Sequence, residues 1–281
     1  MQTQDQLKEL VKQKYSEIAL QDKIENQSSC CGSGGCSTEV YNIMSEDYTR
    51  LEGYTAEADL GLGCGLPTQF ARIKKGDVVI DLGSGAGNDV FIARSETGET
   101  GKVIGIDFTP AMIDKARVNA EKLGFHNVEF RQGDIENMPV AGGIADVVIS
   151  NCVLNLVPDK KAVVKEIYRV LKGGGHFSIS DIVLIGELPA SLQSAAEMYA
   201  GCVSGAIQKD EYLDLIKNSG FENITLQKEK VINIPDDILS NYLSAEEITN
   251  FRNSDTGIYS VTVFAQKPAE DKSCCAPGCC N

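Results

Sequence analysis

Short apolar runs alternate with amphipathic segments through the middle of the chain. The runs are rich in Val and Ile and show little polar alternation, which is typical of parallel strands buried on both faces. The segments between them repeat apolar residues at spacings of three and four, which predicts helices. We expect strands at 78–82, 103–107, 128–132, 145–151 and 176–183, and helices at 88–95, 110–123, 160–171 and 209–218. This order predicts an α/β fold, with a mostly parallel sheet and helices on both faces.

The two ends of the chain follow a different pattern. Residues 5–20 show the spacing of an amphipathic helix, and helical spacing returns over 38–60. After the fifth strand we expect a helical insert over 189–205. Two late strands, over 224–234 and 258–266, would complete a seven-stranded sheet.

Composition divides the chain into three parts. Residues 1–64 hold the N-terminal helix, a Ser/Gly-rich loop at 28–37 and a segment expected to cover the ligand. Residues 65–267 form the main domain, which includes the insert. Residues 268–281 form a cysteine-rich tail that is too short and too polar to be a domain.

Acidic residues outnumber basic ones. Forty Asp and Glu against 26 Lys and Arg leave a formal net charge of −14. Such a chain repels the phosphate backbone of a nucleic acid and the anionic surface of a membrane. The first residues lack the apolar core of a secretory signal, and no stretch approaches the roughly 20 apolar residues that span a bilayer. We expect a cytoplasmic protein that binds neither nucleic acid nor membrane.

Three glycines follow the first strand of the predicted sheet. Gly83, Gly85 and Gly87 lie between that strand and the next helix, where they allow a tight turn and a close approach of backbone amides to a ligand. The sixth position counted from Gly83 is Asn88, so the turn lacks the dinucleotide pattern G-x-G-x-x-G. It also lacks G-K-[ST], which excludes a P-loop.

The next two strands also end in polar positions. Asp107 ends the second strand, where a carboxylate accepts hydrogen bonds from both hydroxyls of a ribose. Gly133 and Asp134 follow the third strand, where an adenine ring would lie. The alternative is a set of ordinary strand-to-helix turns, each with a surface Asp. Three features in register on successive strand ends favour a nucleoside site.

Together these residues resemble the S-adenosylmethionine (SAM) site of class I methyltransferases, whose fold is Rossmann-like. The resemblance spans about 65–267 and includes the Y-R-V-L-K-G-G-G segment at 168–175. It implies that SAM is the methyl donor. It further implies a set of cofactor-binding residues: Asp81, Gly83, Gly85, Gly87, Asp107, Met112, Gly133, Asp134, Ile135 and Asn151.

The chain has ten cysteines, which is many for an acidic protein expected in a reducing compartment. Seven lie at 28–37 and in the last eight residues, which leaves Cys64, Cys152 and Cys202. A lone cysteine is most often a small buried apolar residue. These three are too far apart in sequence for a zinc finger or ribbon, but we expect the predicted fold to bring them to one edge of the sheet. Three thiolates suit a soft, thiophilic acceptor.

The sequences around these cysteines resemble the arsenite methyltransferases. The matching motifs are G-L-G-C-G-L-P at 61–67, N-C-V-L-N-L-V-P-D-K at 151–160 and G-C-V-S-G-A at 201–206. The resemblance implies that Cys64, Cys152 and Cys202 bind As(III) and that SAM methylates it.

The same family uses a Cys-Cys-Gly segment near the N-terminus to pass a disulfide to the core cysteines as arsenic changes oxidation state. Cys30 and Cys31 match that segment, and Cys36 is a further candidate. The resemblance therefore implies catalytic roles for Cys30 and Cys31, and a thioredoxin-like or small-thiol reductant as partner. The cysteine pairs in the tail either collect metalloid or exchange disulfides, or they have no catalytic role.

Two alternatives remain at this stage. A carbon methyltransferase of quinone biosynthesis shares the sheet, the glycine turn and the 168–175 segment, but needs no set of three cysteines. A thiol-rich metal-binding or metal-sensing protein could instead hold Zn(II) or Cu(I) with its terminal cysteine pairs.

Overall fold

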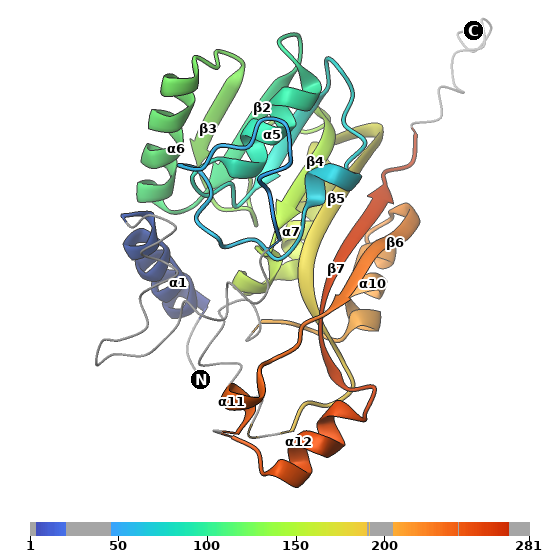
Figure 1. Cartoon of the computed structure of the whole chain (residues 1–281). Helices are drawn as coiled ribbons and strands as arrows, with labels where there is room; N and C mark the ends of the chain where they lie inside the picture. The colour runs from blue at the N-terminus through green and yellow to red at the C-terminus, as the bar shows by residue number, and fades with distance from the viewer. Residues whose placement is uncertain (1–3, 21–45, 190, 192–204, 241, 270–281) are drawn as a thin grey trace, which may run out of the picture.

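The computed structural model describes residues 4–20, 46–189, 191, 205–240 and 242–269 (Figure 1). Within them, seven strands form one sheet in the order β3-β2-β1-β4-β5-β7-β6. The first five strands are parallel, and β7 runs antiparallel to β5 and β6. The strands are β1 (Val78–Leu82), β2 (Lys102–Asp107), β3 (Val128–Gln132), β4 (Ala145–Asn151), β5 (Leu171–Ile185), β6 (Glu222–Val231) and β7 (Gly257–Gln266). The predicted mostly parallel seven-stranded sheet is confirmed.

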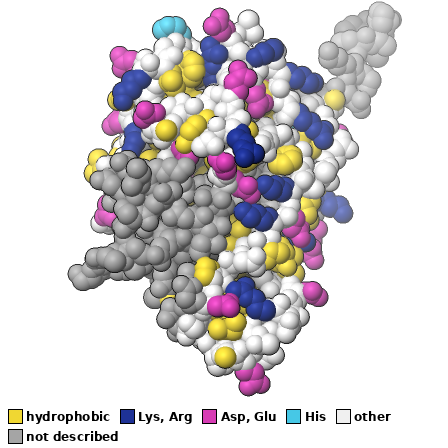
Figure 2. Space-filling model, viewed as in Figure 1, with side chains coloured by type: hydrophobic (Ala, Val, Ile, Leu, Met, Phe, Trp, Pro, Cys, Tyr) yellow, Lys and Arg dark blue, Asp and Glu magenta, His cyan; other side chains and the backbone are white. Residues whose placement is uncertain are grey.

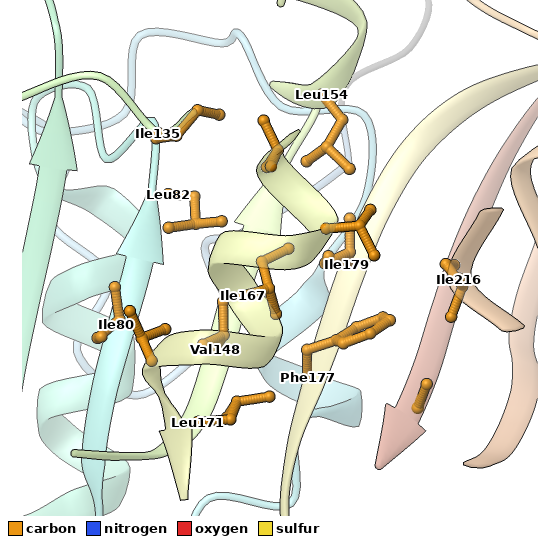
Figure 3. Packing of buried hydrophobic residues seen from close by; sticks show 14 of the residues in the cluster. Ile80, Leu82, Ile135, Val148, Leu154, Ile167, Leu171, Phe177, Ile179 and Ile216 are labelled. Carbon is orange, nitrogen blue, oxygen red and sulfur yellow. The ribbon is translucent and has the colours of Figure 1, made fainter. Parts of the chain in front are cut away.

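Helices cover both faces of this sheet, as predicted. The described helices are α1 (Gln4–Ala19), α4 (Pro67–Phe70), α5 (Asn88–Thr97), α6 (Pro110–Leu123), η1 (Leu154–Leu156), α7 (Lys160–Val170), α10 (Lys209–Asn218), α11 (Asp236–Leu239) and α12 (Ala245–Arg252). On one face α7 packs Ile167 against Ile80 and Phe177 (Figure 3). On the other face α5 and α6 pack against Val79. Neighbouring residues of β1 thus enter opposite cores, which explains the unbroken apolar run.

The helical spacing expected over 38–60 does not give a helix in the described part of that segment. Residues 46–60 form turns that run along α5. Tyr48 is buried and packs with Leu66 and Ile92, so its apolar ring contacts residues that are distant in sequence. Gly53 allows the close approach, because a Cβ there would lie 2.6 Å from the carbonyl oxygen of Phe91. The prediction was wrong because tertiary packing produced the apolar pattern.

Smaller differences lie in the second half of the chain. The fifth strand was expected over 176–183, but β5 begins at Leu171, directly after α7, so the three glycines at 173–175 lie within the strand. Neither α11 nor α12, which join β6 to β7, was predicted. Almost all of the insert expected over 189–205 lies outside the described residues.

Lys and Arg side chains are interspersed with Asp and Glu over the described part of the face in Figure 2. This mixture accompanies the excess of acidic residues in the sequence. Among the described residues, no helix combines the length and the apolar character needed to cross a bilayer.

Candidate active site

A cavity lies at the carboxyl ends of β1, β2 and β4. Ligands of open parallel sheets bind at this edge, because the connecting turns there leave room and present backbone amides. Seven of the ten predicted cofactor residues line it: Asp81, Gly83, Gly85, Asp107, Asp134, Ile135 and Asn151. The structure therefore brings most of the predicted site together around one space.

The other three predicted cofactor residues are not among those that line the cavity. Gly87 begins α5 with a φ of 102°, and a Cβ there would lie 2.8 Å from the Phe91 ring. Met112 is fully buried against α1 and the glycine turn. The amide of Gly133 donates to the carbonyl oxygen of Asp107 at 3.0 Å. These three residues pack behind the residues that line the cavity.

The carboxylate of Asp107 is held in place by the backbone around it. Its Oδ2 accepts from the amide of Gly85 at 3.0 Å, and its Oδ1 accepts from the amide of Thr109 at 2.8 Å. Burial raises the pKa of Asp107, and these two amides oppose that rise. Each oxygen retains a further lone pair, so the pair of oxygens can still accept two hydroxyl groups of a ribose.

Further carboxyl groups make this end of the cavity acidic. Burial and, to a smaller extent, the charge of Asp59 raise the pKa of Asp89 to about 6. Burial also holds the pKa of Asp81 well above its usual range, and repulsion from Asp89 and Asp107 adds to this effect. A cationic ligand would stabilise these groups in their ionised form. Asp59 and Asp89 were not among the predicted site residues, although Asp89 lies two residues after Gly87 in the first turn of α5.

The N-terminal helix forms one wall of the same cavity. Lys8 and Tyr15 of α1 line it, and Lys8 Nζ lies 2.6 Å from Asp134 Oδ2 and also contacts Glu136. Lys115 of α6 donates to the carbonyl oxygen of Ala19 at 2.9 Å, which fixes the other end of the helix. Helix α1 thus covers the place expected for adenine. Its amphipathic pattern predicted the helix but not this position.

Two of the predicted arsenic ligands are described, and they share one apolar cluster. Cys64 is fully buried and Cys152 is 3% exposed, and neither forms a disulfide within the described residues. Around them lie Ile182 and, from the α11 region, Leu239 and Leu243. Cys152 lines the cavity, and Cys64 is not among the lining residues.

The remaining cysteines, including Cys202, Cys30, Cys31 and Cys36, lie outside the described residues. Within the part of the chain that is described, no group of three or more His, Cys, Asp or Glu side chains is placed to hold a metal ion. A third thiol beside the described pair therefore has to come from the undescribed segments.

Asn151 joins the cavity to the turn that carries Cys64. Its Oδ1 accepts from the amides of Cys64 at 3.0 Å and Gly65 at 3.2 Å. Its Nδ2 donates to the carbonyl oxygen of Gly65 at 2.9 Å, to Asp89 Oδ2 at 3.1 Å and to the Tyr48 hydroxyl. Asn151 was predicted to contact the cofactor. In the structure its side-chain amide bonds to the protein itself. No pattern in the sequence indicated that Tyr48 would lie at this site.

Comparison with known proteins identifies the family. Residues 73–220 match the model of a methyltransferase domain. The arsenite methyltransferase of Halobacterium salinarum is 39% identical over 285 residues, which cover 95% of this chain and 68% of that protein. The chain belongs to the arsenite methyltransferase family. A crystal structure of an arsenic(III) S-adenosylmethionine methyltransferase from Chlamydomonas reinhardtii aligns with a TM-score of 0.62 and 31% identity, over 84% of this chain and 75% of that one.

A relative of the quinone class also matches, over a shorter stretch. The demethylmenaquinone methyltransferase of Lactococcus lactis is 33% identical over 138 residues, which cover 49% of this chain and 55% of that protein. The longer matches to arsenite methyltransferases, together with the buried thiols, favour the arsenite family.

The cavity fits SAM, the methyl donor of this class of methyltransferase. Several buried polar atoms of cavity-lining residues have no hydrogen-bond partner within the described chain, among them Ser84 Oγ, Asn88 Oδ1 and Asp89 Oδ1. Buried polar atoms are normally paired, so such atoms indicate a missing polar ligand. SAM carries hydroxyl, amino and carboxylate groups as well as a positive sulfur, which match these atoms and the acidic wall.

Proposed function

We propose that this chain transfers the methyl group of SAM to trivalent arsenic held by its own thiols. The observation that carries the proposal is that the thiol of Cys152 lines the same cavity as Asp107 and the glycine turn. Membership of the arsenite methyltransferase family supports the same substrate.

The residues around the cavity position the reactants and exclude water. When bound, SAM supplies an electrophilic methyl group on a positively charged sulfur. Asp107 orients the ribose through its two oxygens, and Asp81 and Asp89 hold the cationic end. The apolar cluster around Cys64 and Cys152 keeps water away from the acceptor. Since the lone pair of As(III) is the nucleophile, no general base is needed, and placement accounts for most of the rate.

Arsenite is the substrate in this proposal, bound as a complex with thiolates. As(OH)₃ and three thiols give As(SR)₃ and three waters, so each thiol proton leaves with a hydroxide. Cys64 and Cys152 provide two sulfurs, and Cys202 is the proposed third ligand. Sulfur is preferred because As(III) is a soft centre that oxygen ligands hold weakly.

Single serine variants of the three cysteines test the proposal. Cys64→Ser, Cys152→Ser and Cys202→Ser should each abolish arsenite methylation or greatly reduce it, while SAM binding measured by calorimetry persists. Cys275→Ser, in the tail, is the matched control and should remain active. Near-normal methylation by Cys152→Ser would overturn the proposal.

The redox part of the cycle involves residues beyond those described. Methylation raises arsenic to As(V), and two thiolates return it to As(III) by giving up two electrons and forming a disulfide. We propose Cys30 or Cys31 as one member of that disulfide, and a thioredoxin-like or small-thiol reductant to reopen it. This requirement for a reductant supports the expected cytoplasmic location.

Thiol mapping after a single turnover without reductant tests the relay. A disulfide between Cys30 or Cys31 and Cys64 would support it, and one that involves Cys36 would shift the assignment. If all four thiols stay free, the relay is wrong and methyl transfer is unaffected. We expect deletion of the last eight residues to slow turnover less than substitution of Cys30 and Cys31.

A further inference from the structure

One side-chain amide serves both the cofactor cavity and the arsenic-binding turn. Asn151 ends β4 and directly precedes Cys152. Its oxygen accepts from the amides of Cys64 and Gly65 on the turn. Its nitrogen donates to Asp89 and Tyr48, which line the cavity, and also to the carbonyl oxygen of Gly65. The amide therefore bonds to the turn and to the cavity at once, and a rotation that weakens one set of bonds weakens the other.

The surroundings leave this amide little freedom. A Cβ at Gly63 would lie 2.7 Å from Asn151 Nδ2, so the turn passes directly over the side chain. The Tyr48 hydroxyl lies 3.1 Å from Asp89 Oδ2 and 2.9 Å from the carbonyl oxygen of Gly65. Tyr48 and Asp89 are both buried, so these bonds are not exchanged freely for bonds to water.

Asp89 is the member of the network that responds to a cationic ligand. Its pKa is about 6, because burial raises it and the donors Asn151 and Tyr48 counteract part of that rise. Among the described residues, the carboxyl groups of Asp59 and Asp81 repel its charge. A cation in the cavity, such as the α-ammonium group that SAM and S-adenosylhomocysteine share, would therefore favour the ionised carboxylate. An ionised acceptor holds an N–H donor more strongly than a neutral one.

We propose that Asn151 is a positioning residue that couples the two sites, so that a filled cofactor cavity fixes the Cys64 turn and arsenite binds with positive cooperativity. The inference rests on the proposed function. It implies that the enzyme captures arsenite mainly when the methyl donor is already present. An arsenic–thiolate complex without a donor would then be the less populated state.

Two substitutions separate the donor of the amide from its acceptor. Asn151→Asp retains an oxygen acceptor for the amides of Cys64 and Gly65 but replaces the donor to Asp89, Tyr48 and the carbonyl oxygen of Gly65. Asn151→Ala removes both donor and acceptor. Asn127→Ala is the matched control, because the Asn127 amide likewise accepts and donates hydrogen bonds, to Arg94, Gly98 and Gly101, at the opposite edge of the sheet.

Calorimetric titration of the full chain with S-adenosylhomocysteine, with and without saturating arsenite and with a phosphine reductant, measures the coupling. Coupling between sites is reciprocal, so the single cofactor site reports it even if the other cysteines also bind arsenite. We expect arsenite to lower the Kd for S-adenosylhomocysteine about fivefold or more in the wild type and in Asn127→Ala. The ratio of the Kd without arsenite to the Kd with arsenite should fall to about one in Asn151→Asp and, where it folds, in Asn151→Ala.

Three results would overturn the inference: a ratio of one in the wild type, an unchanged ratio in Asn151→Asp, or loss of all S-adenosylhomocysteine binding in Asn151→Asp. The last would place Asn151 in the cofactor site itself. Methylation of arsenite by the same wild-type preparation is measured in parallel. A preparation that binds both ligands but methylates nothing would count against the proposed function, whereas a methylating enzyme with a ratio of one would count against the coupling alone.

Discussion

At position 152 a cysteine occupies a backbone conformation that suits glycine. Its φ is 62°, in the left-handed region, and its amide donates to the carbonyl oxygen of Ser180 at 2.8 Å. For a residue with a Cβ this conformation costs roughly 1–2 kcal/mol. The strain lies at a residue with a proposed role in binding, a common place for it.

This strain predicts an unusual order of stability among variants. Cys152→Gly should be at least as stable as Cys152→Ala, because glycine relieves the strain although it fills less space. Cys64 has no positive φ, so Cys64→Gly should be less stable than Cys64→Ala by about 1 kcal/mol. Urea unfolding of the four variants measures both differences. If Cys152→Gly is less stable than Cys152→Ala by the same amount as Cys64→Gly is less stable than Cys64→Ala, the strain is absent.

A second prediction at the scale of one residue concerns Asp107. Asp107→Ala should weaken SAM binding by roughly tenfold to a hundredfold, because a charged acceptor of two buried hydroxyls contributes about 1.5–3 kcal/mol. Arsenite binding should remain. Asp114→Ala, on the exposed side of α6, is the control. Unchanged SAM affinity in calorimetry would mean that the ribose lies elsewhere.

Helix α1 makes a prediction at the scale of an element. Lys8→Ala should raise the Kd for SAM severalfold, because the ion pair with Asp134 and Glu136 ties the helix over the cavity. The wild-type affinity should fall with added salt more than that of the variant, since salt screens a partly exposed ion pair. Lys12→Ala, on the same helix, controls for the change in helix propensity. Equal effects of the two variants would show that the ion pair contributes nothing.

Elements with a clear period could be predicted from the sequence, and those shaped by distant contacts could not. The five parallel strands follow from apolar runs that need no partner information. Residues 46–60 carry apolar side chains that pack against Leu66 and against Ile92 of α5, so their spacing indicates no helix. Helix α12 has no buried residue, and it did have a local signal: Ser244 and Glu247 form a capping box.

The order of the strands determines how much of the site could be predicted. β1 lies between β2 and β4, so the ends of these three strands meet, and residues next to strand ends could be placed together from the sequence. Lys8, Tyr48 and Asp59 reach the cavity from segments outside the sheet. No local pattern records such a contact, so these residues could not be predicted.

At the scale of the whole molecule, the buried carboxyl groups should make the stability of the fold depend on pH. Burial raises the pKa of Asp181 to about 7, and the pKa values of Asp81, Asp89 and Asp107 are also raised. An acid whose pKa is higher in the folded state binds more protons there than in the unfolded chain. Its contribution to stability is therefore greatest below about pH 4 and is lost as the pH rises toward its folded pKa.

Asp181→Asn isolates one of these contributions. Relative to the wild type, its free energy of unfolding should rise with pH between about 4 and 7, by at most about 1.4 kcal/mol per pH unit. Denaturant unfolding at several pH values measures this difference, and Asp236→Asn, at an exposed position, should show none. A difference that does not change with pH would mean that Asp181 ionises normally in the folded state.

The backbone at position 152 also has an evolutionary consequence. A lineage that no longer methylates arsenic gains nothing from a strained cysteine there. Substitution by glycine or asparagine would then be favoured, because these residues adopt this conformation at lower cost. The same lineage could keep the glycine turn and Asp107, and with them another methyl acceptor. The codon at this position should therefore separate arsenic-methylating relatives from those that have changed substrate, even where the rest of the domain is alike.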